Sequence, residues 1–84
     1  MIRFESVNVR TEQNGKVLLY PVIVFSFRET HRVGILKSCY EYTIYYSISE
    51  KTWAGDVIDS SGWHDLTYDE VMEIVEKKHL ERMI

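Results

Sequence analysis

The chain has 84 residues, 45% hydrophobic and 27% charged, so it can form one packed domain (residues 1–84), and the composition argues against intrinsic disorder. Its net charge is −3, and residues 43–84 carry nine acidic side chains against four basic ones, which argues against binding of this half to a phosphate backbone. No apolar run could span a bilayer, the N-terminus lacks a signal-peptide pattern, and a single cysteine fits a reducing compartment, so we expect a cytoplasmic protein without membrane contact.

The N-terminal residues predict a β-hairpin. Residues 2–12 are expected to form one strand, and residues 17–28 are apolar at odd and even positions alike, which is typical of a strand buried on both faces. Asn14-Gly15 between them is a strong hairpin signal, because a type I′ turn needs positive φ at both central residues. That loop would place Phe4 opposite Phe25. We therefore predict that residues 17–28 form the central strand of a small antiparallel sheet.

Residues 33–49 predict a third strand, after a polar turn at residues 29–32. This turn would place Phe25 opposite Leu36 and Pro21 opposite Tyr40. Because Pro21 has no N–H to donate, we expect an irregularity near Pro21 and Tyr40. Residues 52–58 could return as a short fourth strand, and residues 59–62 are expected to form a turn.

The C-terminal residues carry the clearest local signature, which is that of a helix over 68–83. Thr67 and Glu70 form a capping-box pattern, with Thr67 as N-cap and Glu70 three residues later. An apolar stripe follows at helical spacing and should lie across the sheet; it consists of Val71, Met72, Val75, His79 and Met83. The expected fold is therefore α+β, a three- to four-stranded antiparallel meander packed on one C-terminal helix.

Both predicted registers agree on which side chains share a face of the sheet. The face expected to pack on the helix collects aromatic and aliphatic residues, namely Ile2, Phe4, Leu19, Ile23, Phe25, Phe27, Leu36, Tyr40, Tyr42, Ile44, Tyr46 and Ile48. The second face also collects apolar residues, namely Val7, Val9, Leu18, Tyr20, Val22, Val24, Ile35 and Tyr45. This is more than a small monomer usually exposes in one patch, so the second face needs a cover.

Two covers are open on the sequence alone. Residues 53–66, with Trp53 and Trp63, could fold back over the second face, or another protein or a second copy of the chain could bind there. If a protein binds, the expected interface consists of Tyr20, Val22, Val24, Tyr45 and Trp53, with Asp56, Asp59 and Asp65 facing a basic partner.

No pattern predicts catalysis, a cofactor or a metal. His31, His64 and His79 share no metal-ligand spacing, and Cys39 has no C-x2-C companion. The segment from Asp56 to Gly62 fails the ligand spacing of a calcium loop. No nucleophile elbow or phosphate-binding glycine loop is present.

These observations predict a non-enzymatic protein-interaction module that self-associates or acts as a small adaptor or inhibitor. By analogy, small acidic phage-encoded proteins that inhibit host enzymes have a similar build. The alternative is an accessory protein that binds single-stranded nucleic acid on strand tyrosines such as Tyr40, Tyr42, Tyr45 and Tyr46. Nucleic acid is the less favoured partner, because three of these tyrosines share the predicted core face.

Overall fold

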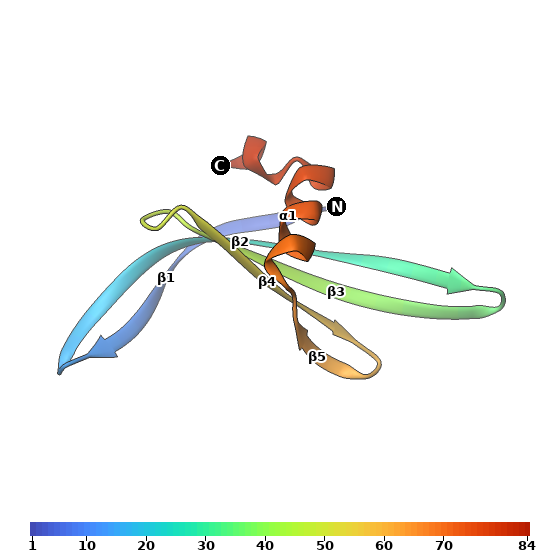
Figure 1. The fold of residues 1–84 in the computed structure, drawn as a ribbon, viewed down its shortest axis with the longest axis horizontal. Helices are drawn as coiled ribbons and strands as arrows, with labels where there is room; N and C mark the ends of the chain where they lie inside the picture. Colours follow the sequence, from blue (N-terminus) through green and yellow to red (C-terminus); the bar gives the residue numbers. More distant parts are fainter.

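The computed structural model describes residues 1–84 as a five-stranded antiparallel sheet with a C-terminal helix, an α+β arrangement (Figure 1). Neighbouring strands of the sheet are also consecutive in the sequence, so every connection between strands is a hairpin. The prediction of an antiparallel meander with one C-terminal helix is confirmed, except that the sheet has five strands instead of three or four. The chain has no helix with the length and apolar character needed to cross a membrane.

Strands β1 (Arg3–Gln13) and β2 (Lys16–Val33) form the predicted hairpin around Asn14-Gly15. Both turn residues have positive φ, 51° at Asn14 and 75° at Gly15, as a type I′ turn requires. Phe4 lies opposite Phe25 as expected, and the pairing continues through all eleven residues of β1 without a bulge.

The predicted second turn at residues 29–32 is wrong. β2 continues through these residues to Val33, and the chain reverses at Gly34-Ile35 into β3 (Leu36–Ser47). Gly34 has φ 62° at the first central position, where a type II′ turn takes glycine. Phe25 therefore lies opposite Ile44, eight positions beyond the predicted Leu36. An even displacement leaves every side chain on its predicted face.

The irregularity expected between Pro21 and Tyr40 does not occur. Pro21 lies one residue beyond the β2–β3 ladder, which ends at Val22 opposite Ser47. Its missing N–H therefore costs no ladder bond, and its carbonyl oxygen accepts a bond of 3.2 Å from the N–H of Ile48.

The expectation that residues 17–28 form an inner strand along their whole length is also wrong. β1 pairs with residues 16–26 of β2, and β3 pairs with residues 22–33. Only residues 22–26 therefore have a strand on both sides. The two ends of β2 extend in opposite directions as hairpin arms, one shared with β1 and one with β3 (Figure 1).

β4 (Thr52–Asp59) and β5 (Gly62–Asp65) complete the sheet. β4 matches the expected short strand at 52–58, and it pairs with β3 over residues 52–58. β5 was not expected from the sequence, because its four residues G-W-H-D have a glycine, two polar groups and no apolar alternation.

Helix α1 (Tyr68–Lys78) begins at the predicted capping box. The Thr67 side chain accepts a bond of 3.2 Å from the N–H of Glu70, whose carboxylate accepts one of 3.0 Å from the N–H of Thr67. The helix does not continue to residue 83: His79 adopts the left-handed conformation, φ 56°, and the short 3₁₀ helix η1 (Leu80–Met83) follows.

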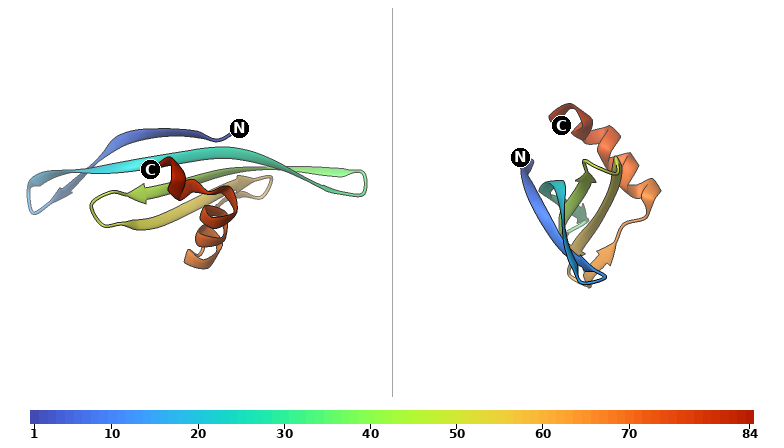
Figure 2. Two further views of the ribbon diagram at one scale, coloured as in Figure 1. Left: turned by 90° about the horizontal axis from the view of Figure 1, so that it is seen from above. Right: turned by 90° about the vertical axis from the view of Figure 1, so that its left-hand side faces the viewer.

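The core lies between the helix and the middle of the sheet (Figure 2). Its six buried side chains come from β2, β3, α1 and η1; they are Phe25, Phe27, Ile44, Val71, Val75 and Leu80. All three of the sheet residues were predicted for the core face. Leu19 and Leu36 share that face but stay exposed, because they lie on the hairpin arms beyond the reach of the helix.

The molecule is unusually extended for its size. Its principal extents are 53 × 28 × 21 Å and its radius of gyration is 14.8 Å, against about 12 Å for a compact chain of this length. Only eight of the 84 residues are buried. The arms therefore carry apolar side chains on surfaces that the rest of the chain leaves open.

Candidate protein-interaction surface

The sheet face turned away from the helix, hereafter the outer face, carries a contiguous apolar patch. It is formed by alternate residues of β1 and β2, which we call the outer patch: Val7, Val9, Leu18, Tyr20, Val22 and Val24. The register places Val7 opposite Val22 and Val9 opposite Tyr20, so the patch runs along both strands. Val9 is 43% exposed and Leu18 36%. Tyr20, Val22 and Val24, which the sequence singled out, lie here together.

Residues 53–66 do not cover the outer patch. They form β4 and β5, which extend the sheet sideways instead of folding over it. Trp53 lies on the helix side, with its ring 5.9 Å from that of Phe25 and 4.6 Å from that of Tyr46. Trp53 therefore does not join the expected interface, and Trp63 on β5 remains 58% exposed. No segment of the chain lies over the outer patch.

Tyr45 connects the outer patch to an acidic corner of the same face. It lies opposite Val24, and its hydroxyl donates a bond of 3.2 Å to Asp56 Oδ2. Burial, followed by the nearby Asp56 charge, raises the pKa of Tyr45. Asp65 lies directly opposite Asp56 on β5, so two like charges face one another across the ladder.

Asp59, the third predicted interface carboxylate, lies apart from this corner. It closes the β4–β5 turn, accepting bonds from the Ser61 N–H (2.8 Å) and the Ser61 hydroxyl (2.6 Å). These two bonds lower the pKa of Asp59. The structure thus brings six of the eight predicted interface residues onto one face, namely Tyr20, Val22, Val24, Tyr45, Asp56 and Asp65, and places Trp53 and Asp59 elsewhere.

His64 joins Ser61 and Asp59 in a cluster that the sequence did not predict. Its Nε2 lies 2.8 Å from Ser61 Oγ and 3.3 Å from Asp59 Oδ1. In a catalytic triad the acid orients one ring nitrogen and the nucleophile bonds to the other. Here serine and aspartate share one nitrogen, and the serine proton is directed at the carboxylate. The arrangement fits a hydrogen-bonded turn and not an activated nucleophile.

A second polar cluster ties the β2–β3 arm to the helix. Lys78 Nζ lies 2.8 Å from Glu29 Oε1 and 5.1 Å from the centre of the Phe27 ring. The hydrogen bond from Lys78 lowers the pKa of Glu29 against the opposing effect of burial. This pair holds the base of the arm against α1. No grouping of three or more His, Cys, Asp or Glu side chains suited to a metal ion is present.

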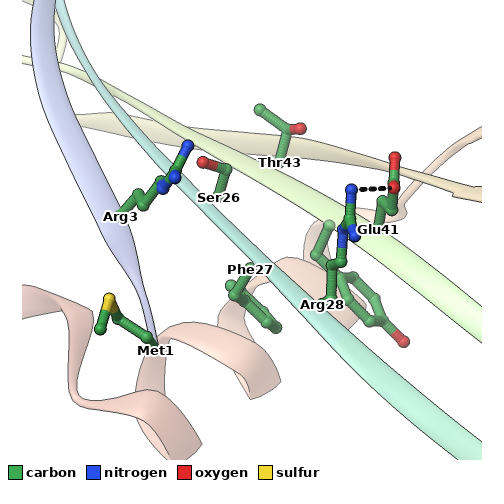
Figure 3. A pocket seen from close by; sticks show the side chains of 8 residues that line it. Met1, Arg3, Ser26, Phe27, Arg28, Glu41 and Thr43 are labelled. Atoms are coloured by element: carbon green, nitrogen blue, oxygen red, sulfur yellow. Dashed lines mark ion pairs between the residues drawn. The ribbon is translucent and has the colours of Figure 1, made fainter.

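A notch interrupts the outer face at the start of β1, where the β1–β2 pairing ends at Arg3 opposite Ser26 and β2 continues without β1 as a neighbour. Figure 3 shows Arg3 and Ser26 on one side of this notch, with the Arg28–Glu41 ion pair, 3.0 Å long, on the other. Phe27, which lies between Ser26 and Arg28 on β2, points toward the helix. The notch separates the outer patch from the polar part of the β2–β3 arm.

The strand tyrosines that suggested nucleic-acid binding lie mostly on the helix side. Tyr42 stacks on Phe27 with ring centres 5.1 Å apart, and Tyr46 packs on Trp53. Their faces are therefore partly occupied by other side chains of the chain.

Comparison of the chain with protein-family models, curated proteins and solved structures finds no match.

Proposed function

We propose that this protein is a non-enzymatic protein-interaction module, which self-associates or acts as an adaptor or inhibitor, and that the outer patch is its binding surface. The observation that carries the proposal is the patch of six apolar side chains on the outer face, of which Val9 and Leu18 are exposed and the other four are partly exposed. Apolar side chains removed from water stabilise a complex by about 25 cal/mol per Å² buried, before the costs of association. A partner that covers this patch gains that free energy.

Polar groups border the outer patch and would give a partner orientation. Glu5 and Tyr45 flank Val24 in the same row across three strands, and Asp56 accepts the bond from Tyr45. An apolar centre with a polar rim is the usual anatomy of a protein interface. The sequence alternative, single-stranded nucleic acid bound on tyrosines, has less support because Tyr42 and Tyr46 pack against other aromatic rings.

A pair of adjacent substitutions tests the proposal. Leu18 points to the outer face and Leu19 to the helix face of the same arm, and Leu19 is the more exposed, at 63% against 36%. Leu18→Glu and Leu19→Glu therefore change the same chemistry on opposite faces. The immobilised wild-type protein and the Leu19→Glu variant should both capture the same binding partner, either another protein or the chain itself, from a lysate of the cells that make this chain. The Leu18→Glu variant should not capture that partner.

Equal capture by all three forms would contradict the proposed surface. Capture of no protein at all, including the chain itself, would contradict the proposed function. Circular dichroism spectra of the three forms should coincide, since both leucines lie on exposed positions of an arm.

A further inference from the structure

Resting on the proposed function, we propose that the partner of the outer patch is a second copy of this chain, and that two copies stack outer face to outer face. The product is a symmetric sandwich of two five-stranded sheets with the helices on the outside. Three observations support a second copy: the surplus surface of the chain, the β-branched side chains of the outer patch, and the balance of charge on the outer face.

The surplus surface is sufficient for a stable dimer. The chain exposes 6597 Å², whereas a compact protein of 10.0 kDa exposes about 5,200 Å². The surplus is therefore about 1,400 Å². A standard protein interface removes about 800 Å² from each partner. One face-to-face contact can bury the standard area of about 800 Å² on each chain. The exposed surface per chain would then be closer to that of a compact protein.

The shape of the outer patch matches another sheet. Four of its six members are valines on two adjacent strands, paired as Val7 with Val22 or flanking that pair. β-Branched side chains fit a pleated, half-buried sheet surface, where they pack against the side chains of a facing sheet. Two such faces pack about 10 Å apart with their strands nearly aligned. A second copy supplies an identical face.

The charge on the outer face does not oppose self-association. Although the chain has a net charge of −3, the outer-face positions of the five strands carry both signs in near balance. The basic ones are Arg3, Lys16, Arg28, Arg32 and Lys37, and the acidic ones are Glu5, Glu41, Asp56 and Asp65. The remaining acidic residues lie on α1 and η1, in turns and on the helix side of the sheet. A face with almost no net charge lacks the electrostatic attraction that would favour a strongly basic partner over a second copy of the chain.

Pairing through the open edge of β1 is the competing way to join two copies. Because Asn14-Gly15 is a two-residue loop, Gln13 and Lys16 form a hydrogen-bonded pair, and odd residues of β1 bond to β2. The N–H of Asn8 therefore points to the open edge. Edge pairing would leave the outer patch exposed, so it does not cover the apolar side chains of that patch.

Light scattering on the purified full chain tests the proposal. The wild type should have twice the chain mass of 10.0 kDa. A double variant on the outer patch, Val9→Glu with Leu18→Glu, should have the single-chain mass. The matched variant on the other face of the arm, Val17→Glu with Leu19→Glu, should remain a dimer. Asn8→Pro should also remain a dimer, because it removes an edge donor without touching the face.

Three results would overturn the stacked dimer: a single-chain mass for the wild type, a dimer that survives the outer-patch variant, or a dimer lost on Asn8→Pro. Each variant is first checked for a wild-type circular dichroism spectrum, and Leu18→Glu against Leu19→Glu repeats the comparison if a double variant does not fold. A single-chain wild type that still captures another protein through Leu18 would refute the dimer and leave the proposed function standing.

Discussion

Gly55 lies directly opposite Ile44 in the β3–β4 ladder, and the Ile44 side chain occupies the space that a side chain at position 55 would need. A Cβ placed on Gly55 would lie 2.7 Å from Ile44 Cδ1 and 3.0 Å from the Thr43 carbonyl oxygen. Ile44 is fully buried in the core and cannot move away freely.

Gly55→Ala should therefore destabilise the protein by about 1–3 kcal/mol through overpacking. Chemical denaturation measures the change, with Ala54→Ser as the control. Ala54 is the exposed neighbour on the same strand, and its substitution should change the free energy of unfolding by about 0.5 kcal/mol or less. An equal effect of the two substitutions would mean that Ile44 does not pack on Gly55.

Leu80 should be a principal core residue although it lies outside α1. It is fully buried in η1, one residue after the left-handed His79 ends the helix. Leu80→Ala should cost about 2–5 kcal/mol, as expected for deletion of a buried leucine side chain. Met83→Ala in the same turn, where Met83 is 36% exposed, should cost about 1 kcal/mol or less. A continuous helix through residue 83 would place His79 on the sheet and make the Leu80 substitution mild.

The capping box should contribute to the stability of α1. Thr67→Ala removes the acceptor for the Glu70 N–H and should destabilise the protein by about 1 kcal/mol. Thr67→Ser keeps the hydroxyl and should restore most of the loss. Thermal unfolding followed at a helix-sensitive wavelength provides the comparison. If the serine and alanine variants unfold at the same temperature, the Thr67 bond is not stabilising.

Glu29 should titrate below its ordinary range because of Lys78. The ion pair forms only with the ionised carboxylate, so its stabilisation is complete above the ordinary pKa of 4.5 and disappears as the pH falls through the lowered pKa. Lys78→Gln should move the pKa of Glu29 upward toward 4.5. Side-chain NMR titration resolves the two values. An unchanged pKa in Lys78→Gln would show that the pair does not persist in solution.

The sequence predicted the first hairpin correctly because Asn14-Gly15 specifies both the turn type and the register. It failed at the second hairpin because the polar residues 29–32 resemble a turn, although they lie within a regular strand. Their side chains are polar because this part of β2 is an exposed arm with β3 as its only neighbour strand. The faces of the sheet were still predicted correctly, since the error in register was an even number of residues.

The candidate interface could be predicted only in part for a related reason. Alternation along β2 places Tyr20, Val22 and Val24 on one face whatever the register. The face of Trp53 and Asp59 depends on how β4 pairs with β3, and no strong turn signal fixes that pairing in the sequence. The Ser61–His64 contact and the burial of Leu80 arise from a short turn and a helix break, neither of which alters the apolar pattern.

Three side chains on one arm test the central claim most directly. Val9 and Leu18 on the outer face are 43% and 36% exposed in the single chain, and Val17 on the opposite face is 46% exposed. Methyl-resolved NMR with a dissolved paramagnetic reagent measures their contact with solvent. If the outer patch binds a second copy, the Val9 and Leu18 methyl groups should be protected from the relaxation that the reagent causes. The Val17 methyl groups should relax strongly. Relaxation of all three in proportion to these exposed fractions would contradict an outer face covered by protein.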